Sequence, residues 1–262
     1  VAFALTIYNL PNSVDFTTAI DIAGNLGKMN LIDTSFDPQS RYTLWSGLTG
    51  GLFLSLSYFG TDQSQVQRYL GGVSIKESRL GLMFNGLLKV PMQFFILLTG
   101  VMVFVFFLFH QPPAFFNQPG MDTALETNYA EEIRGLEAEH NAIFNLKREA
   151  LLSYSENPSQ NQHELETARL LQHDQDEVRN KLKATISQAA PEVETKDSDY
   201  IFLTYILNFL PAGIIGLLLA VIFSAAMSST ASEINALAST TVVDFYKRIF
   251  KPDGDDKHYV VV

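Results

Sequence analysis

The chain has 262 residues, of which 47% are apolar, 28 are acidic, 18 are basic and none is cysteine. The net charge of -10 argues against a nucleic-acid-binding protein, because such proteins present basic surfaces to phosphates. The charge is also uneven: residues 111–199 hold 17 acidic and 8 basic side chains, whereas the rest of the chain holds 11 acidic and 10 basic. One third of the chain therefore carries nearly all the negative charge, which excludes an ordinary soluble globule.

The first 41 residues read as the end of one membrane helix followed by a loop. Residues 1–10 resemble the tail of a membrane span that ends before Pro11. Residues 11–41 predict an external loop with a short amphipathic helix over 16–27, capped by Gly27. The chain begins at Val1 without the basic segment or cleavage site of a signal peptide. We therefore expect an internal fragment of a longer membrane protein.

Three long stretches without a charged residue predict membrane-spanning helices. They contain 20, 32 and 33 residues and cover positions 42–61, 90–121 and 200–232. A bilayer core of about 30 Å takes roughly 20 apolar helical residues to cross. We expect the chain to be all-α and polytopic, with an external short helix over 200–210 and spans over 42–67, 80–110 and 211–246.

The basic residues of the short loops are sorted to one side of the predicted membrane. The loop 68–79 and the tail 247–262 contain seven of them: Arg68, Lys76, Arg79, Lys247, Arg248, Lys251 and Lys257. Only Lys28 and Arg41 lie on the other side. Because positive residues in short loops favour the cytoplasm, we place 68–79 and 247–262 inside the cell. Residues 11–41 and 111–199 are then outside the plasma membrane.

Residues 111–199 predict an acidic helical hairpin outside the membrane. Apolar residues recur at helical spacings over 123–153 and 163–189, and an Asn-Pro-Ser turn at 157–159 separates the two helices. The hairpin is typical of a cap or docking surface. Its histidines, His140, His163 and His173, have no partners at metal-ligand spacing, and we expect them on a solvated surface.

Polar residues within the predicted spans are functional candidates, because such residues are costly in lipid. Ser55, Tyr58, Asp62 and Gln65 share one helix face, which could line an aqueous path with Tyr58 as an aromatic wall. For Asp62 and Gln65 the alternative is the polar cytoplasmic end of the helix, where Asp62 meets Arg68 or a lipid headgroup.

Two further features of the spans allow more than one interpretation. Lys89, next to the helix-bending Pro91, could reach a substrate or a carboxylate, or extend to the membrane surface. A stripe of small residues on the last span allows either close helix packing or an oxygen-ligand site for sodium. Its members, spaced at i, i+3, i+4 and i+7, are Ala225, Ser228, Ser229 and Ser232.

Three segments resemble the sodium/solute symporter family, which includes sodium–glucose and sodium–iodide transporters. They are LSLSYFGTDQSQVQRYL at 54–70, LLKVPMQFF at 87–95 and FLPAGIIGLLLAVIFSAAMSSTASEINALASTTVVDFYKR at 209–248. The resemblance is to bacterial members in particular. It implies that the chain is part of an inverted-repeat (LeuT-like) transporter, which binds its substrate at mid-membrane.

Matched position by position, the resemblance also implies roles for individual residues. The carbonyl of Ala225 and the hydroxyls of Ser228 and Ser229 would form a sodium site shared across the family. Ser232 matches a position that helps form a second sodium site in some members. Tyr58 matches the aromatic gate that closes off the substrate in sugar transporters, and Lys89 matches a lysine that contacts sugar hydroxyls there.

The sequence thus predicts part of a sodium-coupled symporter that imports a small polar solute, such as a sugar, sialic acid or a carboxylate, by alternating access. Its expected partners are the sodium ion, the solute, the lipid bilayer and the rest of its own transporter chain, and not nucleic acid. The alternative is a sensor with a transporter-like membrane domain, in which a signalling module would follow Val262. No catalytic triad, metal cluster or phosphate loop is evident, so we do not expect an enzyme.

Overall fold

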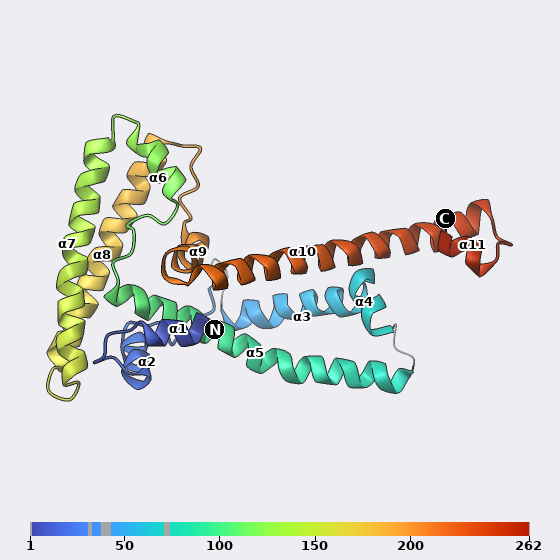
Figure 1. The fold of residues 1–262 in the computed structure, drawn as a ribbon, viewed down its shortest axis with the longest axis horizontal. Coiled ribbons are helices and arrows are strands. Elements are labelled where there is room, and N and C mark those ends of the chain that lie inside the picture. The colour runs from blue at the N-terminus through green and yellow to red at the C-terminus, as the bar shows by residue number, and fades with distance from the viewer. Residues whose placement is uncertain (1, 31–32, 38–42, 71–73, 262) are drawn as a thin grey trace. The chain divides into compact units, whose positions relative to one another are not determined.

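The computed structural model of the chain describes residues 2–30, 33–37, 43–70 and 74–261. Within these ranges every regular element is a helix (Figure 1). The helices form two compact units. Unit 1 consists of Val1–Leu31 and Gln93–Pro211, and unit 2 consists of Ile32–Met92 and Ala212–Val262. An all-helical chain agrees with the sequence-based expectation for a membrane transporter fragment.

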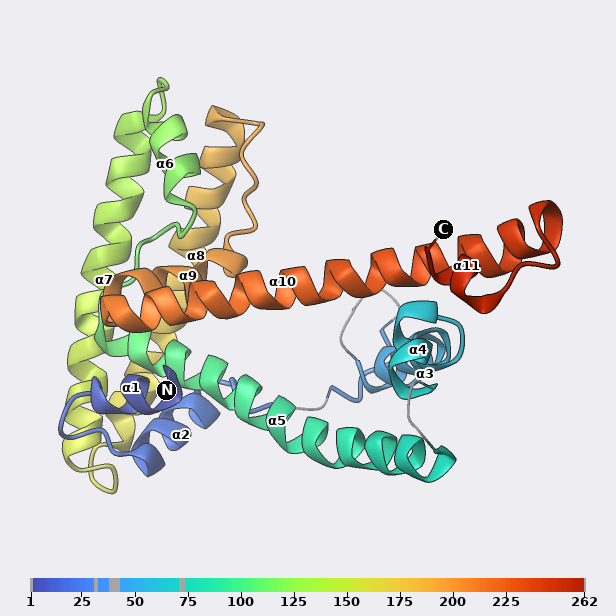
Figure 2. The same cartoon turned by 45° about the vertical axis from the view of Figure 1, so that its right-hand side comes forward.

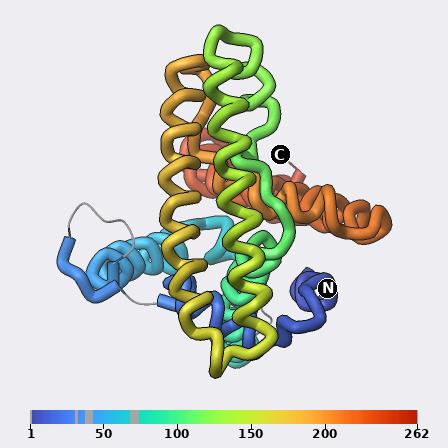
Figure 3. The backbone as a smooth tube through the Cα atoms, turned by 90° about the vertical axis from the view of Figure 1, so that its left-hand side faces the viewer, coloured from blue at the N-terminus to red at the C-terminus, as the bar shows by residue number. Residues whose placement is uncertain are grey.

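Unit 1 is built around two long helices that run side by side in opposite directions, α7 (Ala130–Glu156) and α8 (Gln162–Ala189) (Figures 2 and 3). The backbone N–H of Asn157, the C-cap of α7, turns back to Tyr154 O, so α7 ends just before Pro158. The remaining helices of the unit are α1 (Ala2–Tyr8), α2 (Phe16–Asn25), α6 (Gln118–Leu125), α9 (Ser198–Phe209) and the second part of α5 (Ile75–Phe109).

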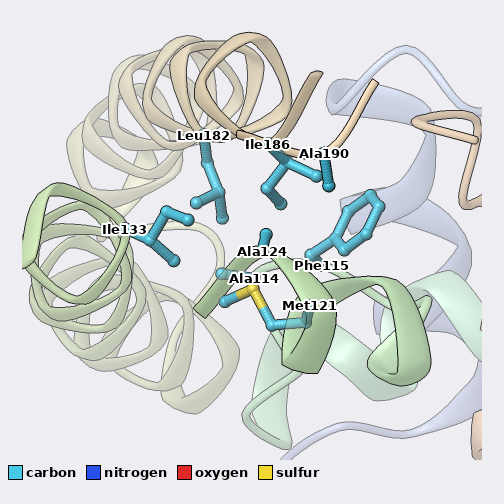
Figure 4. Close-up of a cluster of buried hydrophobic side chains, with 8 residues drawn as sticks. All are labelled: Ala114, Phe115, Met121, Ala124, Ile133, Leu182, Ile186 and Ala190. Atoms are coloured by element: carbon cyan, nitrogen blue, oxygen red, sulfur yellow. The ribbon is translucent and has the colours of Figure 1, made fainter. Parts of the chain in front are cut away.

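An apolar cluster holds one end of the hairpin together (Figure 4). Ile133 of α7 faces Leu182 and Ile186 of α8, and all three side chains are fully buried. The segment before α7 closes the cluster with Ala114, Phe115, Met121 and Ala124, and Ala190 completes it after α8. Burying a Leu or Ile side chain contributes about 1.5–3 kcal/mol. The hairpin is therefore held by long-range packing in addition to helix propensity.

The first helix of the hairpin starts later than the sequence pattern predicts. We expected one helix over 123–153, but the structure has a break between Leu125 and Ala130. The hydroxyl of Thr127 donates to Ala124 O at 2.7 Å and accepts from the backbone N–H of Tyr129 at 3.3 Å. Such local side-chain bonds compete with the helical ladder and favour a turn at this point.

The other end of the hairpin is tied to the N-terminal helices. The hydroxyl of Tyr154 donates to a carboxylate oxygen of Asp21 on α2, and the hydroxyl of Ser155 donates to Ser13 Oγ at 2.8 Å. The helix α2 ends close to Gly27, which has a φ of 75°. Glycine adopts this left-handed conformation without steric cost, which agrees with its predicted role as a cap.

Unit 2 contains α3 (Leu44–Gly60), α4 (Gln63–Leu70), the first part of α5, α10 (Ala212–Thr240), the π-helix η1 (Thr241–Phe250) and α11 (Asp256–Val261). We expected one continuous helix over 42–67, but the structure breaks it at Thr61 and Asp62. The hydroxyl of Thr61 donates back to Ser57 O at 3.0 Å. The carboxylate of Asp62 accepts from the backbone N–H of Ser64 at 3.0 Å and so caps the new helix.

In the part of the chain that the structure describes, two helical segments are long and apolar enough to cross a membrane. They are Ile75–Phe109 and Ala212–Phe250, the latter combining α10 and η1. Both agree with predicted spans. The predicted span over 42–67 is represented by α3, which has 17 residues, and its crossing of the membrane stays a prediction.

Candidate functional site

The predicted sodium-binding residues lie on one stretch of α10. A helix advances about 100° per residue, so Ala225, Ser228, Ser229 and Ser232 fall on one face. The first three are exposed and Ser232 is half-buried. The hydroxyl of Ser232 donates to the carbonyl of Ser228 at 3.1 Å. That carbonyl is therefore hydrogen-bonded to another residue of the stripe.

This stripe can supply some of the ligands of a hard cation. Hydroxyl and carbonyl oxygens bind such ions without full carboxylate charges, and cations of this kind are surrounded by shells of several oxygens. The hydroxyls of Ser228 and Ser229 and the carbonyl of Ala225 are three oxygens from one helix. The stripe therefore forms one side of a possible site, and further oxygens have to come from another element.

The structure brings Tyr58 and Lys89 together, although they lie on different helices. The ammonium nitrogen of Lys89 on α5 is 5.5 Å from the centre of the Tyr58 ring on α3. At this distance the ring face attracts the cation. Both residues were candidates for contact with the solute, and their proximity means that a ligand near one would also meet the other.

Asp62 has a local structural role in this chain. Its carboxylate accepts from the backbone N–H of Ser64 and from the Ser64 hydroxyl at 2.8 Å. These bonds cap the start of α4. Asp62 therefore lies at the junction between α3 and α4, four residues after Tyr58. The alternative contact with Arg68 falls on a side chain outside the described residues.

A contact between α4 and α10 was not foreseen from the sequence. Asn235 Nδ2 donates to Gln67 Oε1 at 3.1 Å. Both residues lie within segments that carry the resemblance to the symporter family. This shared resemblance is the one feature of the sequence that could have suggested the contact. The contact links the helix that follows Asp62 to the helix that carries the serine stripe.

The hairpin histidines differ in their surroundings. The side chains of His163 and His173 are 74% and 72% exposed, as expected for a solvated surface. The expectation was wrong for His140, which is buried at 3% exposure. Burial lowers the pKa of His140 to about 4, so the ring is neutral near pH 7. Among the described residues, no group of histidine and acidic side chains is arranged to hold a metal ion.

Comparison with known proteins identifies relatives of the chain. The model of the sodium:solute symporter family matches residues 181–262, which include the serine stripe. The human sodium/iodide cotransporter is 37% identical over 90 residues, or 34% of this chain and 14% of that protein. Sodium-coupled monocarboxylate transporter 2 of Mus musculus is 34% identical over 70 residues, or 27% of this chain and 11% of that protein.

One bacterial relative aligns along most of the chain. The sodium/glucose cotransporter of Vibrio parahaemolyticus is 23% identical over 216 residues, or 82% of this chain and 27% of that protein. The chain thus spans roughly a quarter or less of these relatives. No solved structure matches it significantly. The resemblance seen in the sequence is confirmed: residues 181–262 match the sodium:solute symporter family, and the relatives are sodium-coupled transporters, not enzymes.

Proposed function

We propose that the chain is part of a sodium-coupled secondary active symporter in the plasma membrane. The observation that carries this proposal is the match of the symporter family model to residues 181–262, because that segment contains Ser228 and Ser229. The two long apolar helical segments, Ile75–Phe109 and Ala212–Phe250, support a multi-pass membrane protein. Large apolar side chains along α10, such as Phe223 and Leu237, are exposed and would be covered by lipid or by other helices of the transporter.

In this proposal sodium binds at the carbonyl of Ala225 and the hydroxyls of Ser228 and Ser229, with Ser232 next to them. An element of the same transporter outside this chain, the broken helix of an inverted-repeat fold, would supply the remaining oxygens. Sodium would favour the outward-open state because it binds that state more tightly. Each ion that moves down 100 mV releases about 2.3 kcal/mol, which can drive the uphill import of a solute.

The solute would lie near Tyr58 and Lys89. The relatives are named for iodide, monocarboxylates and glucose, which are small and polar or charged. The Lys89 ammonium donates to hydroxyls and carboxylates alike, and the Tyr58 ring can close over a small solute. We therefore propose a sugar, sialic acid, a carboxylate or a similar solute, with Asp62 shaping the helix junction beyond the gate.

Sodium-dependent uptake by the full-length transporter tests this function. Ser229→Ala should keep expression and remove most of the sodium dependence, because it deletes one predicted ligand. Thr230→Ala is the matched control: it removes a neighbouring hydroxyl that donates to Ala226 O at 2.9 Å and lies about 100° around the helix. Uptake from a panel of sugars, sialic acid, carboxylates and amino acids would identify the solute. Unchanged sodium dependence in Ser229→Ala would contradict the site.

A further inference from the structure

A cavity of about 670 Å³ lies within unit 1, between the end of α5, the helical hairpin and α9. One wall is apolar and comes mainly from α5, including Val103, Phe104 and Phe107. The polar part of the lining comes from α7 and α8, including Lys147 and Arg179. Cavities of about 300–1,000 Å³ accommodate small-molecule ligands. This one offers such a ligand both an apolar and a charged surface.

The charge of the cavity is opposite to that of the hairpin that forms it. Residues 111–199 hold 17 acidic and 8 basic side chains. Among the described residues that line the cavity, however, Lys28, Lys147 and Arg179 are basic and only Asp176 is acidic. Asp176 is exposed, whereas Lys147 is buried. The lining therefore favours an anion, although the surrounding surface is acidic.

Lys147 is the most informative residue of the lining, because its side chain is only 3% exposed. Its ammonium donates to Gln172 Oε1 at 2.7 Å and to Gln175 Oε1. Both acceptors are neutral amides, and they use two of the three N–H donors of the ammonium. The only carboxylate among the described lining residues, Asp176, is exposed and offsets this charge only in part. A buried charge is costly without a close counter-charge. An anion in the cavity would offset that cost and accept from the third donor.

Aromatic rings hold the other two cations beside the apolar wall. Lys28 Nζ is 4.9 Å from the centre of the Phe104 ring, and the Arg179 guanidinium is 5.3 Å from that of Phe116. Both rings also line the cavity. Positive charge is therefore placed directly next to apolar surface, which suits a molecule with an anionic end and an apolar body.

We propose that this cavity binds an anionic amphiphile, with its phosphate or carboxylate at Lys147 and Lys28 and its apolar tail along α5 and α9. The Arg179 guanidinium beside them is already paired with the buried carboxylate of Asp197. The helix α5 is long and apolar enough to span a bilayer, which would place the cavity at the end of a span, within reach of lipid head groups. A bilayer phospholipid and a soluble long-chain carboxylate share this chemistry. The proposal does not depend on the sodium site.

Native mass spectrometry of the full-length protein in a neutral maltoside detergent can measure retention of four probes: phosphatidylglycerol, phosphatidylcholine, laurate and acetate. We expect phosphatidylglycerol to be retained over phosphatidylcholine if the source is the bilayer, or laurate over acetate if it is soluble. Lys28→Gln should weaken retention about fivefold, which corresponds to about 1 kcal/mol for one basic residue. Lys147→Gln should weaken it further.

The choice of variants keeps the result interpretable. Lys28 is exposed, so Lys28→Gln tests the site even if Lys147→Gln does not fold. Lys181→Gln removes an exposed lysine of α8 that does not line the cavity, and it should retain the probes like the unmodified protein. The proposal is overturned if neither anionic amphiphile is retained above its partner probe, or if Lys28→Gln and Lys181→Gln behave alike.

Discussion

Asn235 Nδ2 on α10 donates to Gln67 Oε1 on α4 at 3.1 Å, across 168 positions of sequence. This bond joins two of the three segments that resemble sodium symporters. It connects the helix of the serine stripe to α4, the helix that follows the Tyr58 segment.

The side-chain bond between Asn235 and Gln67 should contribute about 0.6 kcal/mol, as interhelical hydrogen bonds in membrane proteins do on average. A double-mutant cycle of Gln67→Ala and Asn235→Ala, read from unfolding midpoints, should give a coupling of that size. The cycle of Gln63→Ala with Asn235→Ala is the control, since Gln63 lies one turn earlier on α4. Equal couplings in both cycles would refute the contact.

Because Lys89 lies 5.5 Å from the centre of the Tyr58 ring, we expect the ring to contribute more to solute uptake than the Tyr58 hydroxyl does. Tyr58→Phe keeps the ring and should transport nearly as well as the unmodified protein. Tyr58→Ala should reduce uptake about twofold to thirtyfold at any sodium concentration, because contacts of this type are worth roughly 0.5–2 kcal/mol. Phe53→Ala removes an exposed ring from the same helix and serves as the control. Equal losses in Tyr58→Phe and Tyr58→Ala would assign the effect to the hydroxyl.

Much of the helical layout could be predicted, because it depends on local patterns. Uncharged runs located α5 and α10, and the Asn-Pro-Ser turn located the end of α7. The breaks at Thr61 and Thr127 could not be read from apolar spacing, since they depend on side-chain bonds to nearby backbone. Those bonds compete with the backbone hydrogen bonds of the helix, and the spacing of apolar residues carries no information about them.

The burial of His140 and Lys147 in the hairpin could have been predicted from their spacing in the sequence. Ile133, His140, Phe144, Lys147 and Leu151 follow one another at steps of seven, four, three and four, so they share one face of α7, and all five are buried. His140 and Lys147 thus lie on the apolar stripe. The cavity itself could not be predicted, because it combines residues from α5, α8 and α9 that meet only in the folded chain.

Asp197 should be a main determinant of hairpin stability. Its carboxylate is fully buried. Arg179 Nη2 lies 2.7 Å from Oδ2 and Lys183 Nζ lies 2.7 Å from Oδ1, and Oδ2 also accepts from the backbone N–H of Phe116 at 2.8 Å. The Oδ1 atom has no well-directed hydrogen bond, so its contact with Lys183 is ionic. Breaking a buried ion pair costs about 3–5 kcal/mol. Asp197→Asn should therefore lower the unfolding free energy of the hairpin by that amount.

Because of this carboxylate, we expect the stability of the hairpin to depend on pH in the acid range. Burial alone would raise the pKa of Asp197, but Lys183, the Phe116 N–H and Arg179 together lower it below its ordinary value of 3.8. A lowered folded-state pKa gives stability that is present above about pH 4 and is lost as pH falls through the folded pKa. Hydrogen exchange of α7 and α8 should show this loss in the unmodified protein and not in Asp197→Asn. The exposed Asp174→Asn should behave like the unmodified protein.

Lys147 predicts how anion retention in the cavity depends on pH. Burial lowers its pKa to about 8, against a smaller opposing effect of Asp176. Its charge is thus present below pH 8 and is lost as pH rises through that value. The other charged side chains of the lining are Lys28, Arg179 and Asp176. His140, whose pKa burial lowers to about 4, is neutral over this range.

Retention of phosphatidylglycerol or laurate should therefore be constant from pH 6 to 7 and fall between pH 7 and 9. A bound anion stabilises the ammonium, so the midpoint should move upward as the probe concentration rises. Lys147→Gln should retain the probe weakly and without this step, whereas Lys28→Gln should bind weakly and keep the step. A step that persists in Lys147→Gln would assign the titration to another group, because both probes stay anionic over this range.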